Sequence, residues 1–281
     1  MYYFDRLCKI VIENNNKIEI SDCKIKFEVM KSSVAKENTA KIDIYNLSPT
    51  TRSMIARLDT LVRIYAGYAN YKGLVEIGQG DISKVKTNRD LTEVVTEIYL
   101  TEGLKRIRTN PVTLSYKKDP KLSDILDSVK SQTGFGIRTI GVDTSSILSG
   151  GYSDIGSVDN VLDNLAIQFD FDWSVQNGVV LIKGRKITSQ KEIMLLTPQS
   201  GLILNPEAVH KVSRKIEKSK ITKEFPRTHS ITALLQPQLQ VQDVIAIESQ
   251  DLNGKFKIEK LTHKGDTYGN DWYSDMEVVA L

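Results

Sequence analysis

Three histidines, and the carboxylates that follow one of them, are the side chains most suited to acid–base chemistry. His210, His229 and His263 lie far apart, and no HxH or HExxH spacing joins them. His263 ends an alternating segment, and a polar loop with Asp266 and Asp271 follows it. A histidine beside two carboxylates could act as a general acid or base. Because no nucleophile or ligand motif accompanies His263, we favour a loop histidine held by hydrogen bonds.

Other catalytic signatures are missing from the sequence. Gly78-Gln79-Gly80 lacks the third glycine and the lysine of a phosphate-binding loop. No GxSxG motif occurs. Asp170 and Asp172 are spaced along one expected strand in a way that does not support a paired-carboxylate glycosidase. We therefore expect no enzyme activity, no cofactor and no metal centre.

Two cysteines flank an expected hairpin. Cys8 begins a strand to Glu13, a turn follows at 14–16, and the return strand starts at Lys17 and leads to Cys23. The pairing brings the two thiols near each other, so a disulfide is geometrically conceivable. Two free thiols are the favoured alternative for a chain made in a cytoplasm.

The segment 211–227 is strongly basic. It holds seven basic and two acidic residues in a chain whose net charge is +3. It could contact phosphate or an acidic partner, although a solvated strand and loop is the favoured interpretation. Only Phe225 is available for stacking on bases, so we expect no sequence-specific recognition of nucleic acid. Loose electrostatic contact with DNA stays open.

The composition is that of an ordinary globular protein. The 281 residues are 40% hydrophobic and 26% charged, and the length suffices for two or three domains. No apolar run reaches the roughly 18 residues that a membrane-spanning helix needs. The first 16 residues carry charges where a signal peptide needs an apolar stretch. We expect the chain to be made and assembled in a cytoplasm.

A strand followed by a capped helix, over 38–58, is the element around which the rest is organised. Ala40, Ile42 and Ile44 alternate with polar residues, which predicts a half-buried strand. Ser48 then occupies a helix N-cap position and Pro49 the first helical position. A short amphipathic helix at the mouth or edge of a β-barrel is the expected result.

The remaining pattern predicts a mainly β fold with an α/β insert. Residues 1–108 read as about seven strands, with a polar turn at 87–90 and a bulge or close approach at Gly78 and Gly80. Residues 109–187 read as a small α/β domain with helices at 122–133 and 158–169, the second capped by Ser157, a loop at 141–154 and an Asn177-Gly178 hairpin. Residues 188–281 return to strands, including 192–196, 201–204 and 255–263, then a polar loop at 264–270 and a closing strand from Trp272. We expect two β-barrel-like domains in one compact body, with the insert outside it.

Two stretches resemble the baseplate hub proteins of tailed bacteriophages, the Mu-type and related family. The first is AKIDIYNLSPTTRSMI, residues 40–55. The second, residues 234–281, contains the motif residues Pro237, Leu239, Asp243, Val244, Gly254, Phe256, Ile258, His263, Gly265, Asp266, Gly269 and Trp272. The order of the three expected domains matches as well, so the resemblance covers essentially the whole chain.

The resemblance implies a structural virion protein. Family members form a homotrimeric ring whose two tube domains per chain continue the hexameric tail tube, meet the trimeric spike or central tip, and contact other baseplate proteins. DNA passes through the lumen without sequence-specific binding. The candidate subunit or partner contacts are Ser48, Pro49, Arg52, Lys211, Arg214, Lys215, Lys218, Lys220 and Lys223. His263, Asp266 and Trp272 are assigned structural roles, with Trp272 expected in the core of the last domain.

Two alternatives stay open at this point. A cell-envelope-degrading tail enzyme of the lysozyme or peptidase type would need catalytic residues, and the insert is short and poor in paired acids. A carbohydrate-binding β module would need an aromatic platform, whereas Trp173 and Trp272 are far apart in the sequence.

Overall fold

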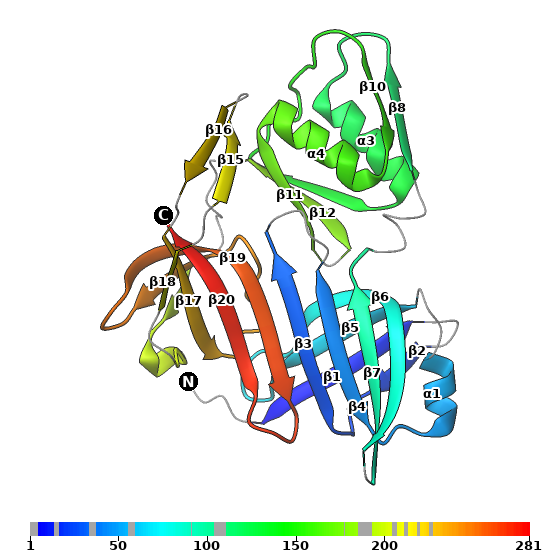
Figure 1. The fold of residues 1–281 in the computed structure, drawn as a ribbon, viewed down its shortest axis with the longest axis vertical. Helices are drawn as coiled ribbons and strands as arrows, with labels where there is room; N and C mark the ends of the chain where they lie inside the picture. The colour runs from blue at the N-terminus through cyan, green and yellow to red at the C-terminus, as the bar shows by residue number, and fades with distance from the viewer. Residues whose placement is uncertain are drawn as a thin grey trace.

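The computed structural model describes residues 5–13, 17–33, 38–55, 60–90, 92–103, 111–176, 178–184, 193–203, 207–210, 213–217, 220–224 and 227–281. Two β bodies lie side by side, and an α/β insert lies at one end of them (Figure 1). The expected fold class, mainly β with an α/β domain between two barrel-like β regions, is confirmed.

The first β body contains seven strands. In the order β3-β4-β7-β6-β5-β1-β2, neighbouring strands pair antiparallel. The strands are β1 (Arg6–Glu13), β2 (Lys17–Ile20), β3 (Ile25–Ser32), β4 (Thr39–Tyr45), β5 (Leu61–Tyr68), β6 (Gly73–Asp90) and β7 (Glu93–Thr101). Alternating isoleucines and valines fill the curled interior. The expected turn between β1 and β2 lies outside the described residues.

Helix α1 (Pro49–Ile55) covers this body as the sequence predicts. The Ser48 hydroxyl accepts a hydrogen bond from the Thr51 amide at 3.1 Å, which is the expected N-cap. Ile55 is fully buried and belongs to the core of the first body. The cap and this one anchoring side chain place the helix beside β2 and β7 (Figure 1).

Strand β6 corrects one expectation and confirms another. The polar residues at 87–90 do not turn; they pair with β7 as far as Asp90 opposite Glu93. Residues 87–89 are exposed, and their polar side chains give this part of the strand the composition of a turn. The bulge expected near Gly78 is present, because the β5–β6 register shifts beside it. A Cβ at Gly78 would lie 2.6 Å from a Val29 methyl, so close approach requires this glycine.

The insert folds around its own core. It comprises β8 (Val112–Tyr116), α3 (Leu122–Thr133), β9 (Gly136–Ile140), β10 (Tyr152–Gly156), α4 (Val158–Phe169), β11 (Phe171–Gln176) and β12 (Val179–Gly184). Both helices have the predicted bounds, and Gly134 ends α3 with a φ of +70°. Ser157 occupies the N-cap of α4, but its side chain makes no capping hydrogen bond. The loop expected at 141–154 is shorter, because β10 pairs with β8.

The last β body contains β13 (Met194–Leu196), the 3-10 turn η1 (Pro198–Ser200), β14 (Glu207–His210), β15 (Ser213–Glu217), β16 (Lys220–Glu224), β17 (Arg227–Leu234), β18 (Val244–Glu248), β19 (Asn253–Asp266) and β20 (Trp272–Ala280). Strand β19 continues through 264–266, which the sequence pattern assigned to a loop. In the segment expected at 201–204, Leu202 forms an isolated bridge with Ala233, and residue 204 lies outside the described residues.

One sheet joins the two β bodies. Strand β3 pairs with β4 on one side and with β19 on the other, so the sheet passes from one body into the next. Leu235 and Trp272 belong to the apolar core of the first body rather than the last. The expectation that Trp272 fills the core of the last domain is therefore wrong. The β19–β20 turn carries its indole across the seam.

Both cysteines are free in the structure. Cys8 is buried in the first core, and burial, together with the neighbouring Cys23, raises its pKa to about 12. The thiol therefore stays protonated near neutral pH.

Candidate functional site

The outer face of the joined sheet carries the most organised set of charges. On β3, Phe27 and Val29 point into the core while the residues between them face outward. The same alternation holds for the neighbouring strands β4 and β19. Because the seam brings β19, β3 and β4 together in register, their polar faces form one continuous surface.

Charges of opposite sign alternate on this surface in both directions. The six residues, here called the charge checkerboard, are Lys264 and Asp266 on β19, Glu28 and Lys26 on β3, and Lys41 and Asp43 on β4. Along the sheet, each residue stands opposite a residue of the other sign. Along each strand, the sign changes again two residues later. Three positive and three negative groups make the set neutral.

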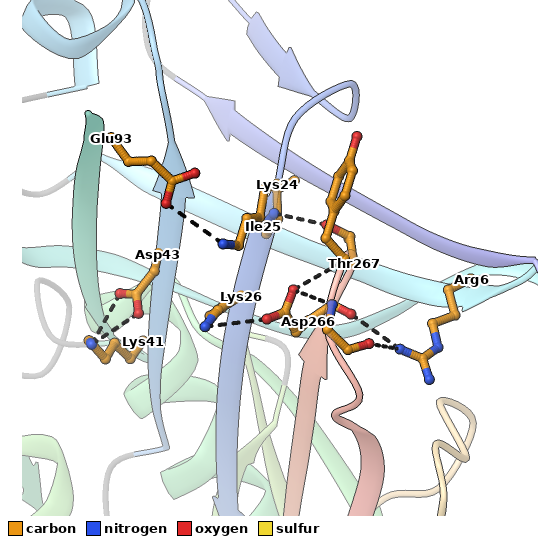
Figure 2. Close-up of polar contacts among 11 residues, drawn as sticks. Arg6, Lys24, Ile25, Lys26, Lys41, Asp43, Glu93, Asp266 and Thr267 are labelled. Atoms are coloured by element: carbon orange, nitrogen blue, oxygen red, sulfur yellow. Dashed lines mark hydrogen bonds and ion pairs between the residues drawn. The ribbon is translucent and has the colours of Figure 1, made fainter. Parts of the chain in front are cut away.

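Ion pairs connect members of the checkerboard (Figure 2). Lys26 Nζ lies 3.3 Å from Asp266 Oδ2, and Lys41 Nζ lies 3.1 Å from Asp43 Oδ1. Lys264 lies 3.9 Å from Glu28. Most of these side chains are at least one-third exposed, so each pair stabilises the fold only slightly. Their principal effect is to cancel one another's charge.

The checkerboard lines a shallow cavity of about 170 Å³. Phe27, Gly265 and Asp271 complete the lining. All of its lining residues except Phe27 and Gly265 are charged, whereas sites for small molecules are lined mostly by hydrophobic side chains. We interpret the cavity as an ordinary depression of the protein surface rather than a ligand site.

Asp266 is the most enclosed member of the checkerboard. Its Oδ1 accepts hydrogen bonds from the amides of Tyr268 and Gly269, both at 2.9 Å. Burial alone would raise the pKa of Asp266, but these amides and the Lys26 ammonium outweigh it, so the pKa lies below its ordinary value. The carboxylate therefore shapes the β19–β20 turn and needs no external ligand.

Arg6 holds the same turn from the start of β1 (Figure 2). Its guanidinium donates to the carbonyl oxygens of Gly269 at 2.7 Å and of Asp266 and Asn270 at 3.3 Å. It also lies 5.4 Å from the centre of the Trp272 ring. Arg6, at the start of the first body, is thus hydrogen-bonded to the turn of the β19–β20 hairpin in the last body.

His263 is not the loop histidine expected from the sequence, and its surroundings do not suit acid–base chemistry. It lies within β19, fully buried, and its Nδ1 is 2.9 Å from the Ser274 hydroxyl. Burial, with a smaller effect of Lys31, lowers its pKa to about 3, so the ring is neutral. Asp266 faces the outer side of the same strand, whereas His263 faces inward.

The helix and basic residues predicted as contacts do not join the checkerboard. Ser48 and Pro49 are exposed and Arg52 is half-buried, all at α1. Arg214 and Lys215 lie on β15, and Lys220 and Lys223 on β16, with Arg214 opposite Lys223. Lys211 and Lys218 lie outside the described residues. The β15–β16 hairpin stands at the end of the last body that faces the insert (Figure 1).

Of the checkerboard residues, only Asp266 was predicted from the sequence as a site residue. The other members are ordinary polar positions of alternating strands. Their arrangement depends on the register between β3 and β19, which belong to opposite ends of the chain. No local signal reports that register.

The described part of the chain holds neither a metal-ligand cluster nor a membrane-spanning helix. No three His, Cys, Asp or Glu side chains there are grouped to hold a metal ion. No helix in those segments is both long and apolar enough to cross a membrane.

Comparison with known proteins gives a fold relationship only. No family model matches the sequence, and no curated protein is similar to it. A 43 kDa tail protein of prophage MuSo2 from Shewanella oneidensis matches with a TM-score of 0.69 and 10% identity, over 97% of this chain and 96% of that one. A tail protein from Neisseria meningitidis matches with 0.69 and 7%, over 98% and 97%.

A type VI secretion component of E. coli, described as structurally similar to T4 tail proteins gp27 and gp5, matches with a TM-score of 0.61 and 9% identity. It is covered over 74% of its length, and this chain over 92%. The two tail proteins are matched almost end to end, which includes both β bodies and the insert. The chain therefore has the fold of phage tail proteins, as the resemblance in its sequence implied.

Proposed function

We propose that the chain is a non-enzymatic structural subunit of a phage baseplate hub, and that three copies form a ring joining the tail tube to the spike. The observation that carries this proposal is the sheet shared by two β bodies through β3 and β19. Two β bodies per chain give six in a trimer. A trimer can therefore match a sixfold tube on one side and a threefold spike on the other.

The free edges of the sheet support ring formation. Among the described strands, β2 and β14 terminate the main path of the joined sheet. Unpaired edges expose backbone donors and acceptors, and neighbouring subunits can pair or cover them. A head-to-tail contact that closes after three copies uses both edges of each chain.

We place the charge checkerboard on the channel wall. A face whose positive groups are paired with carboxylates offers passing DNA few free cations, and free cations are what retain phosphates. DNA would then pass without being held and without sequence-specific contacts. The α1 residues and the β15–β16 hairpin would face neighbouring subunits, the tube, the spike or other baseplate proteins, in a virion assembled in the host cytoplasm.

We also propose three domains, 1–108, 109–187 and 188–281. Three separate apolar clusters support this division, although Leu235 and Trp272 cross into the first. The first and last domains would act as the tube domains.

Native mass spectrometry of the full chain, alone and with the tube and spike proteins of the same virion, tests the ring. We expect a mass of three copies, and images along the tail axis with three subunits around a central opening. Monomers in the presence of both other proteins would contradict the proposal. Lysis zones in a peptidoglycan zymogram would favour the cell-envelope-degrading enzyme instead.

A further inference from the structure

The contacts between the insert and the β bodies differ from the contacts between the two bodies. The two bodies share a sheet, and Leu235 and Trp272 of the last body belong to the apolar core of the first. The described apolar core of the insert draws only on residues 112–182, and its described strands pair only with one another. Hydrogen bonds cross from the insert to the two bodies.

Asn38 and Glu102 form the centre of these contacts. Glu102 Oε2 accepts a hydrogen bond from the Asn38 side-chain amide at 2.7 Å, and its Oε1 accepts one from the Gly178 backbone amide at 2.7 Å. The same Asn38 amide donates to the Val175 carbonyl at 2.7 Å. Asn38 and Glu102 are 5% and 2% exposed. They precede β4 and follow β7, whereas Gly178 and Val175 belong to the β11–β12 hairpin.

Two longer contacts surround this centre. The Gln176 side-chain amide donates to the Ser32 carbonyl at 3.4 Å. Lys183 donates to the Gln242 carbonyl, also at 3.4 Å, which ties β12 to the last body. Apart from the Asn38–Glu102 bond, which lies within the first body, these contacts connect one hairpin of the insert to the bodies.

Charge is buried at the same junction. Burial raises the pKa of Glu102, although Asn38, Lys31 and the Gly178 amide oppose this shift. Lys31 is 3% exposed and donates to Gln240 Oε1 at 2.8 Å. Burial lowers its pKa to about 8, with Glu102, Glu76 and Asp243 acting in the opposite direction. A buried charge gains solvation when a junction opens, which an apolar contact does not.

We propose that Asn38, Glu102 and the Gly178 amide form a latch, and that the insert swings away from the β bodies as a folded unit when the latch opens. Water can replace each hydrogen bond that opening breaks, so the net cost of opening is small. The core of the insert stays intact because it shares no described apolar residue with the bodies. The proposal does not depend on ring formation.

Hydrogen exchange of the full chain tests the latch. In Asn38→Ala, we expect the Gly178 amide to exchange roughly tenfold faster or more, while amides of α3 and α4 keep their wild-type rates. Glu102→Gln is a second variant, since it keeps the shape but replaces one of the two accepting oxygens with an NH2 donor, so that one of the two hydrogen bonds is lost. Small-angle scattering of either variant should show a larger radius of gyration.

A matched control lies inside the insert. Gln132 makes two hydrogen bonds to the Thr113 backbone, both at 2.9 Å, away from the junction. Gln132→Ala should leave the Gly178 exchange rate unchanged. Unaltered Gly178 exchange in both Asn38→Ala and Glu102→Gln would overturn the latch. Faster exchange of α3 and α4 in step with Gly178 would also overturn it, because the insert would then be unfolding.

Discussion

Replacing Trp272 with alanine tests whether the seam makes the two β bodies one unit. The indole is 1% exposed and packs edge-on against Phe27 and Tyr68, with ring centroids 5.4 and 6.4 Å away. Removing a buried tryptophan of this kind costs roughly 3–5 kcal/mol. Each kcal/mol lowers Tm by about 2 °C in a chain of this size, so the expected loss is about 6–10 °C.

The remaining tryptophan makes the assay selective. The chain has two tryptophans, so in Trp272→Ala only Trp173 contributes indole fluorescence. Trp173 is buried in the insert, where its Nε1 donates to Asp163 Oδ1 at 2.8 Å. Circular dichroism during heating follows all three parts, whereas fluorescence follows the insert. In Trp272→Ala, we expect the circular dichroism transition to occur at a lower temperature than in the wild type. The Tm of the fluorescence transition should fall by less.

Tyr268→Ala is the control, since this ring belongs to the adjacent turn and is 75% exposed. Its expected effect lies within about 0.5 kcal/mol of zero. An unchanged Tm in Trp272→Ala would refute the placement of the indole across the seam. A loss confined to the last body, with the first body unaffected, would refute the packing of Trp272 into the core of the first body.

Three further perturbations address the same turn. Arg6→Ala removes donors to three carbonyls and should lower stability by about 1–3 kcal/mol, measured by urea unfolding; no loss would mean that water replaces the guanidinium. Gly265→Ala should cost about 1–3 kcal/mol or more in the same assay, because its Cβ would lie 2.3 Å from Phe27 Cζ; wild-type stability would show that the ring can move. Asp266 has a pKa below its ordinary value of 3.8, so its stabilising effect is present above that pH and is lost as pH falls through the lower native pKa. Asp266→Asn should therefore be less stable than wild type near neutral pH, with the gap closing below about pH 4 in acid-unfolding curves; a gap independent of pH would contradict this reasoning.

Local patterns predicted the elements that depend on local physics. The apolar stripe of α3 and the glycine after it fix both ends of that helix, and α4 has an equally clear stripe. Ser48 and Pro49 specify the start of α1 for the same reason. Strand ends were harder, because strand segments that hold polar residues and glycine, as at 87–90 and 264–266, have the composition of turns.

The register between strands that are far apart in the chain could not be predicted from the sequence. Period-two alternation shows that Trp272 faces inward but not which body receives it. The partners of Lys26 and Glu28 on β19 follow from a pairing between distant strands, so neither the checkerboard nor the seam has a local signal. The junction at Glu102 could not be predicted for the same reason. In the sequence, a buried glutamate at a strand end cannot be told from a solvent-exposed one.

The hydrogen bonds from Arg6 to the β19–β20 turn have a consequence for folding during synthesis on the ribosome. The two ends of that contact, Arg6 and Asp266, are 260 residues apart. The amino-terminal strands therefore emerge long before the segments that complete their interior, whereas the insert emerges as one contiguous stretch and can fold while translation continues. Such sequence-distant pairing is slow. Nascent chains that stall before Trp272 would leave apolar strands uncovered, which makes them substrates for chaperones rather than for assembly.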